Sequence, residues 1–137
     1  MAPSRRLLTG LVAALAVGCE GAARCTEIDV EECRDAPIST FDELHASVLR
    51  PSCGEGLSCH GADDRPAGDI RFDDIELAYA ALSDPARGLV APGAPHCSGV
   101  VQRIESIDPF WRMPPASSLE PAARCAVIRW IRAGAER

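Results

Sequence analysis

Lysine is absent from this 137-residue chain, and all of its 14 basic residues are arginine. The 20 acidic residues outnumber them, so the formal net charge is −6. Binding along a nucleic acid requires cations that neutralise successive phosphates, and an acidic chain is poorly suited to that task. We therefore expect no nucleic-acid partner, whereas an acidic surface is compatible with a neutral or basic protein partner.

Aromatic residues are also few, with three phenylalanines, two tryptophans and one tyrosine in the whole chain. For a domain of about one hundred residues these make a modest core, at a size where apolar burial alone is marginal. A flat apolar macrocycle or a set of disulfides would supply additional stability. Composition leaves both sources open.

The first 18 residues have the pattern of a signal peptide, with two arginines before the apolar run from Leu7 to Val17. That run is too short to span a bilayer. Leu15-Ala-Val-Gly-Cys19 resembles a bacterial lipobox, which predicts that Cys19 carries lipid. The alternative is ordinary cleavage elsewhere, for instance after Ala23. In either case the mature chain is expected to function outside the cytoplasm.

Residues 19–38 are rich in acidic side chains and have no apolar periodicity, so we interpret them as a tether. Residues 39–137 form the expected domain. Alternating strand patterns are missing from it, and helical periodicity predicts an all-α class with four short helices. Their expected limits are Thr40 to Pro51, Asp73 to Pro85, a third helix capped by Ser98, and Ser118 to Ala133.

Two capping boxes, Thr40 to Glu43 and Asp73 to Glu76, mark the first two helix starts. His45 falls on the polar side of the first predicted helix. We therefore expect it at the surface.

The most chemically specific cluster is Cys53, Cys59 and His60, in a loop directly after the first predicted helix. A histidine that follows a cysteine is typical of c-type haem attachment, where two thiols bond to the porphyrin and the imidazole binds iron. The usual spacing is Cys-x-x-Cys-His, and here five residues separate the cysteines. The added loop-closure entropy is only ~0.8 kcal/mol.

The chain resembles cytochrome c-like domains, and the closest type is found in envelope proteins of myxobacteria and planctomycetes. The resemblance covers roughly residues 39–135. It rests on Ser-Cys-His-Gly, Ala-Tyr-x-x-Leu, Val-x-Pro-Gly-x-Pro, Ser-x-Val-Val, Arg-Met-Pro-Pro and Ile-x-Trp-Ile-x-x-Gly-Ala, in that order. It implies helices around a haem or a haem-like cavity, with thioether bonds from Cys53 and Cys59. It also implies His60 as the proximal iron ligand and Met113 as the distal ligand.

Seven cysteines in so short a chain indicate an oxidising compartment. If Cys19 carries lipid and two cysteines hold haem, four remain for disulfides, and they allow three pairings. The simplest joins neighbours in the sequence, Cys25 with Cys33 and Cys97 with Cys125.

The function that the resemblance implies is electron transfer by one covalent haem c, not catalysis on a substrate. The partner would be a redox protein of the cell envelope. The protein would be anchored through Cys19 to the outer membrane and face the periplasm. An alternative is a haem-free binding or scaffolding module stapled by disulfides, with Cys53 bridged to Cys59. A further possibility is a zinc site formed by these cysteines with His60 and His96.

Overall fold

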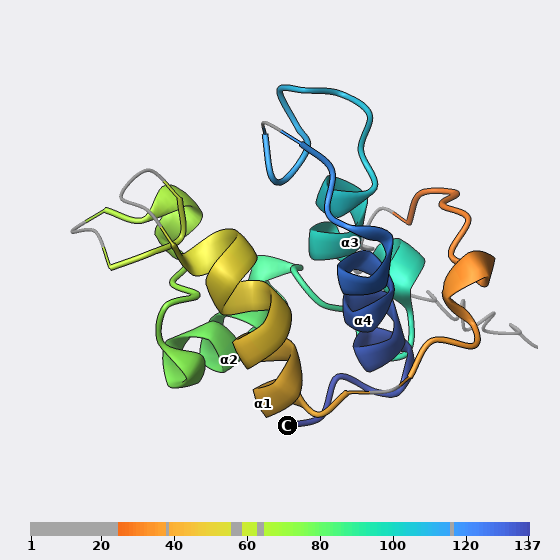
Figure 1. Ribbon diagram of the computed structural model, residues 1–137, viewed down its shortest axis with the longest axis horizontal. Helices are drawn as coiled ribbons and strands as arrows, with labels where there is room; N and C mark the ends of the chain where they lie inside the picture. The colour runs from red at the N-terminus through yellow and green to blue at the C-terminus, as the bar shows by residue number, and fades with distance from the viewer. Residues whose placement is uncertain (1–24, 38, 56–58, 63–64, 116) are drawn as a thin grey trace, which may run out of the picture.

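The computed structural model describes residues 25–37, 39–55, 59–62, 65–115 and 117–137. These residues form a helical body without strands, which confirms the all-α prediction (Figure 1). No helix in the described ranges has the length and apolar character needed to cross a bilayer. The predicted signal peptide and the lipidated Cys19 lie outside the described residues.

Four α-helices and five tighter or wider helical segments make up the body. The α-helices are α1 (Phe41–Leu44), α2 (Ile75–Ser83), α3 (Gly99–Ile104) and α4 (Pro121–Arg132). The other segments are η1 (Glu31–Cys33), η2 (His45–Gly54), η3 (Ala67–Asp69), η4 (Pro85–Arg87) and η5 (Pro95–Cys97).

The first helix begins where the sequence predicts. The hydroxyl of Thr40 accepts a hydrogen bond from the Glu43 amide, and the Glu43 carboxylate accepts one from the Thr40 amide. The prediction that Pro51 ends this helix is wrong, because α1 continues as the π-helical segment η2 through Pro51 to Gly54. A wider turn separates the proline ring from the preceding carbonyls, so the chain stays helical up to the cysteine cluster.

The second helix has a different cap from the predicted one. Asp74 is the N-cap, and its side chain accepts hydrogen bonds from the amides of Glu76 and Leu77. Asp73 instead forms an ion pair with Arg71 at 2.5 Å. Because the half-buried Arg71 side chain binds Asp73, the predicted capping box from Asp73 to Glu76 does not form.

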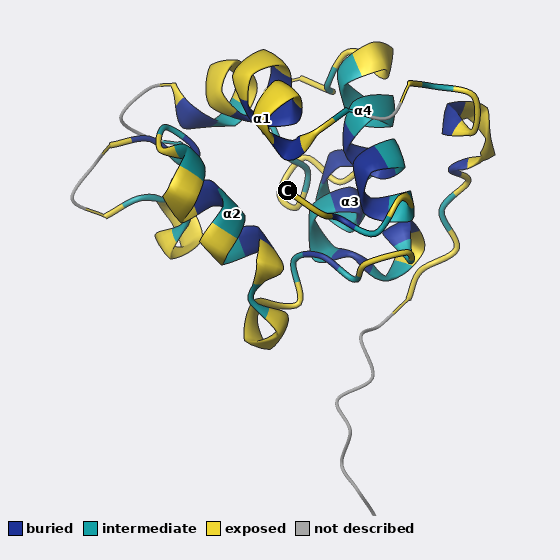
Figure 2. Ribbon diagram, turned by 90° about the horizontal axis from the view of Figure 1, so that it is seen from below, coloured by how far each residue is buried: buried dark blue, intermediate teal, exposed yellow. Residues whose placement is uncertain are grey.

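Helix α4 is the centre of the core, where it contacts α1, α3, η1, η2 and η5. Its inner face buries the four residues expected there: Val127, Ile128, Trp130 and Ile131. The Trp130 ring packs against Phe41 with centroids 5.3 Å apart, and its indole N–H donates to the Glu136 carbonyl at 2.7 Å. Figure 2 shows the buried faces of α1, α3 and α4 turned toward one another.

Two disulfides fasten the N-terminal segment to this body. They join Cys25 to Cys97 and Cys33 to Cys125, so the predicted neighbour pairing is wrong. The true partners are 72 and 92 residues apart in sequence and meet only through tertiary packing. Cys33 is completely buried beside α4. The described part of residues 19–38 therefore lies on the helical body.

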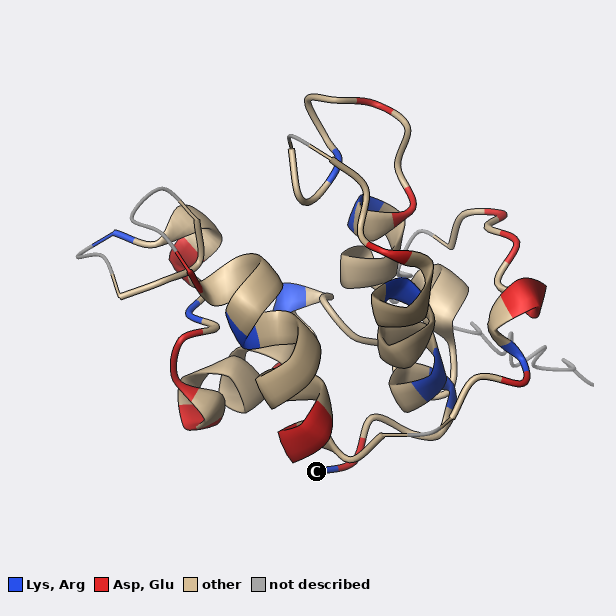
Figure 3. Cartoon of the chain, in the orientation of Figure 1, with Lys and Arg blue, Asp and Glu red and all other residues tan. Residues whose placement is uncertain are grey.

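Charged side chains are spread over the outside of the molecule. Figure 3 shows acidic and basic residues on both halves of the body, with no single track of one sign. Arg124 on α4 pairs with two carboxylates, because it donates to Glu105 at 2.9 Å and also pairs with Glu32. This pair of contacts adds a second connection between η1 and the core.

Candidate functional site

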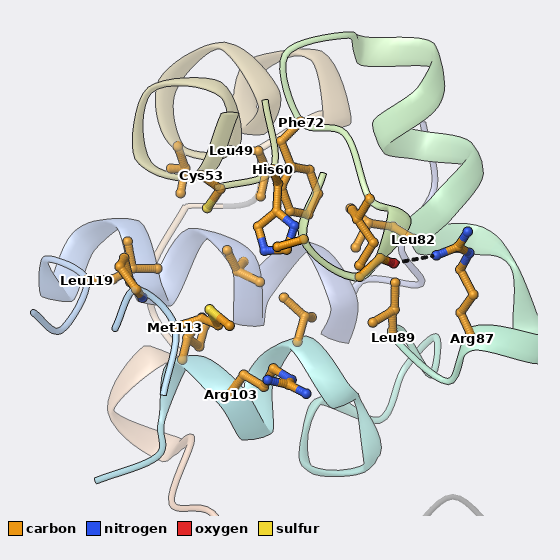
Figure 4. Close-up of a pocket in the computed structure, with 18 residues that line it drawn as sticks. Leu49, Cys53, His60, Phe72, Leu82, Arg87, Leu89, Arg103, Met113 and Leu119 are labelled. Atoms are coloured by element: carbon orange, nitrogen blue, oxygen red, sulfur yellow. Dashed lines mark hydrogen bonds between the residues drawn. The ribbon is translucent and has the colours of Figure 1, made fainter. Parts of the chain in front are cut away.

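An apolar cavity lies between η2, His60 with residues 67–72, and helices α3 and α4. Its volume is about 350 Å³, within the range of small-molecule sites of ~300–1,000 Å³. Apolar side chains make most of its wall, among them Val48, Leu49, Ile70, Phe72, Leu82, Leu89, Ile104, Leu119 and Val127. Figure 4 shows the side chains of His60 and Met113 directed into this space from opposite walls.

His60 reaches the cavity because the chain folds back sharply after η2. Its amide donates to the Cys53 carbonyl at 3.0 Å, and its carbonyl accepts from the Phe72 amide at 2.6 Å. The imidazole packs edge-on against the Phe72 ring at 5.3 Å. Among the described residues, its buried Nδ1 has no hydrogen-bond partner. An unpaired imidazole nitrogen in an apolar cavity is costly unless a bound group uses the ring.

Phe72 is itself held by His45, on the preceding helical segment. The Nε2 atom of His45 lies 2.9 Å from the Phe72 carbonyl oxygen, and the ring is almost fully buried. The prediction of a surface position for His45 is therefore wrong, because the turn through η2 brings it under the loop. Gly54 lets this loop approach, since a Cβ atom there would lie 2.7 Å from the Phe72 carbonyl carbon.

Met113 lies in the loop between α3 and α4. Its amide donates to the Arg103 carbonyl at 3.0 Å, which fixes the loop to the end of α3. The Arg103 guanidinium lies 3.8 Å from the centre of the Trp111 ring, an additional cation–π contact. The peptide bond between Met113 and Pro114 is cis.

The two cysteines of the cluster differ in position. Both are partly buried and neither is in a disulfide. The Cys53 side chain lines the cavity and points into it (Figure 4), whereas Cys59 is not part of the wall. Burial raises the pKa of the Cys53 thiol to about 11, and the neighbouring Cys59 adds to this increase. The thiol of Cys53 is thus neutral near pH 7. The Cys53–Cys59 bridge of the haem-free interpretation is not formed.

Two arginines on the cavity wall were missed in the sequence. Arg87 and Arg103 are the charged side chains among the described wall residues, and no carboxylate accompanies them there. A signal for Arg103 existed, because it follows Val100 by three residues and so shares its helical face. Arg87 carries no such signal. Arg112, which precedes the methionine, is not part of the wall and donates to the Pro115 carbonyl at 3.2 Å.

The four residues of the possible zinc site, Cys53, Cys59, His60 and His96, do not come together at the cavity. His96 lies beside the Cys25–Cys97 disulfide, where the three possible ligand atoms are within 4.8 Å of one another. It is not part of the cavity wall. Cys53, Cys59 and His60 are therefore without this fourth ligand.

The residues around the cavity fit a haem group in their chemistry. An imidazole and a thioether are suitable axial donors for haem iron, and both line the same apolar space. A free thiol lies beside them, as covalent attachment requires. The unpaired Nδ1 of His60 leaves a buried ring nitrogen that a bound group could engage.

Comparisons with known proteins bear on the same region. A family model described as planctomycete cytochrome C matches residues 57–117, which include Cys59, His60 and Met113. A search of curated proteins and a search of solved structures found no match. The family match supports a cytochrome c-like family for this helical chain.

Proposed function

We propose that this protein transfers electrons by means of one covalently bound c-type haem. The observation that carries the proposal is the placement of His60 and Met113 on one apolar cavity, with the Cys53 thiol on the same wall. The family match over residues 57–117 is consistent with it, because that family suggests electron transfer. When bound, haem iron would accept and release one electron.

Each residue of the site has a defined task in this proposal. His60 would hold the iron through a neutral imidazole nitrogen, and Met113 would supply a soft, uncharged thioether that favours the reduced state. Cys53 and Cys59 would each attach through a thioether, in which a C–S bond and a C–H bond form as the thiol S–H bond and the π bond of one vinyl group are lost. The apolar wall would exclude water from the iron.

The location and partners belong to the same proposal. The protein would be held at the outer membrane by lipid on Cys19 and would face the periplasm. It would act as a carrier or relay for a redox protein of the envelope, with no substrate of its own and no nucleic-acid partner.

The test is expression of the full chain in a host that matures c-type cytochromes. We expect a Soret band that persists after denaturation, as covalent haem requires. A colourless protein, or haem that is extracted by acidified organic solvent, would refute the proposal.

The distal ligand is tested by Met113→Ala in the haem-loaded protein. We expect loss of the weak red-region band of the oxidised form, which reports iron bound to a thioether. Leu119→Ala is the matched control, because Leu119 lines the same cavity but has no donor atom. Retention of the band in Met113→Ala would show that another group binds the iron.

The second candidate is a haem-free binding or scaffolding module of the envelope. The two disulfides favour it, because they stabilise the helical body without a cofactor. The same expression experiment separates the candidates, since this one predicts a folded, colourless protein.

A further inference from the structure

The cavity has a charged end that the proposed iron ligands do not explain. Its wall is apolar apart from a few groups, and Arg87 and Arg103 carry its positive charge. No carboxylate lies among the described wall residues to balance them. Arg87 is exposed and Arg103 is half-buried, so each can pair with an anionic group that extends from the cavity toward solvent.

Arg103 has unused hydrogen-bonding capacity. Its guanidinium stacks over Trp111 at 3.8 Å, which orients the group. Among the described residues, no carboxylate forms an ion pair with it. A stacked guanidinium keeps its N–H donors in the plane of the fork, so it is prepared to bind a carboxylate with two parallel hydrogen bonds.

Arg87 is also only weakly engaged. It follows α2 in segment η4, where its Nη1 donates to the Gly68 carbonyl at 3.3 Å. Its Nε is 3.8 Å from an Asp84 carboxylate oxygen. The Arg87 side chain is 35% exposed and the Asp84 side chain is 44% exposed. Exposed pairs of this kind contribute little, so most of its five donors are available.

The two arginines lie away from the thiol. Figure 4 shows Arg87 at the end of the cavity remote from Cys53, and Arg103 with its guanidinium extended in the same direction. The cavity therefore presents a thiol toward one end and Arg87 at the other, with Arg103 on the wall below His60 and its guanidinium directed toward the Arg87 side. A ligand that matches this order has reactive carbon at one edge and carboxylates at the opposite edge.

We propose that Arg87 and Arg103 bind the two propionate groups of the haem and thereby orient its vinyl edge toward Cys53. This inference rests on the proposed function, and it adds selectivity for a porphyrin with free carboxylates. The cations also stabilise the reduced iron, because positive charge near the iron favours the state with one more electron.

The experiment uses the full chain without haem and two probes, metal-free protoporphyrin and its dimethyl ester. We expect the wild-type chain to bind the free acid at least about tenfold more tightly than the ester. Arg87→Gln and Arg103→Gln should each reduce the preference, and the double variant should lose it. Arg50→Gln is the control, because it removes the same charge from an exposed position on η2.

A second readout uses the haem-loaded protein. The double variant is expected to have a lower midpoint potential than Arg50→Gln. With Arg103→Lys in place of Arg103→Gln, the midpoint potential should be partly restored. Lysine keeps the positive charge but lacks the planar, two-pronged donor geometry of the guanidinium. Equal potentials in the double variant and the control, or equal affinity of the wild type for acid and ester, would overturn the inference. Covalent haem with either result leaves the proposed function standing, whereas absence of covalent haem refutes that function separately.

Discussion

Replacing Cys33 and Cys125 together by alanine tests how the N-terminal segment stabilises the fold. With the Cys25–Cys97 bridge intact, the shortest chain path between the two sites runs through that bridge. It comprises the 8 residues from Cys25 to Cys33 and the 28 residues from Cys97 to Cys125, or 36 in all. Loop-closure entropy for ~36 residues is worth ~3.8 kcal/mol.

The other disulfide gives an informative comparison. Because the two bridges close the same ring, removal of Cys25 and Cys97 has the same entropic cost of ~3.8 kcal/mol. Cys33 is fully buried whereas Cys25 is exposed, so the Cys33–Cys125 variant should also lose packing, ~1 kcal/mol for a small cavity. For a domain of this size, we expect the midpoint temperature to fall by about 10–20 °C in either variant.

Removing both disulfides should cost far more than either single change. Once one bridge is gone, the other closes a loop of 72 or 92 residues, worth ~4.5 kcal/mol, and the sum is ~8 kcal/mol. That sum is comparable to the whole stability of a typical domain, ~5–15 kcal/mol. The assay is thermal unfolding of the haem-free chain followed by circular dichroism. Shifts below ~3 °C in both single-bridge variants would refute the reasoning, and the wild type under reduction is the control.

Three further predictions concern the segment that carries His60. Gly54→Ala places a Cβ atom 2.7 Å from the backbone of Phe72, so we expect ~1–3 kcal/mol of destabilisation in urea titrations, and an unchanged midpoint would contradict this contact. His45→Ala removes the partner of the buried Phe72 carbonyl, and a loss of ~1–3 kcal/mol is expected by the same assay, with none if water replaces the imidazole. Because burial raises the pKa of Cys53 to about 11, its alkylation by iodoacetamide should be slow at pH 8 and reach half its maximal rate near pH 11. The unfolded thiol ionises first, near its ordinary value of 9.0, so this group's contribution to stability is full below pH 9 and is lost as the pH rises toward 11. Half-maximal alkylation below pH 9 would show that Cys53 is not buried in solution.

The parts of the fold that short sequence windows encode were predictable. The Thr40–Glu43 capping box involves atoms three residues apart, and the structure contains it. The apolar face of α4 was also visible as periodicity, and Ile128 and Trp130 are buried as that pattern requires. Local chemistry determined both features, so no tertiary information was needed.

The wrong predictions concern features that depend on contacts between residues far apart in the sequence. Cys33 and Cys125 are 92 residues apart, and no local rule favours their pairing over that of neighbours. His45 was assigned to the surface because helical periodicity ignores the segment that returns over η2 and offers its carbonyl. Arg87 had no signal for the same reason, since its position on the cavity depends on how α2 ends.

The bridge from Cys25 to Cys97 has a consequence for how far the protein can move. If Cys19 carries lipid, only six peptide steps separate that lipid from the bridge, a reach of ~20 Å at most. The helical body would then stay within that distance of the bilayer. A redox protein partner would have to bind it close to the membrane surface. If both disulfides were reduced, the segment between Cys19 and the helical body would extend to the start of α1, with a length of ~70 Å when fully extended. Thiol reduction would thereby extend the reach of the protein only together with the loss of the ~8 kcal/mol that the two bridges contribute.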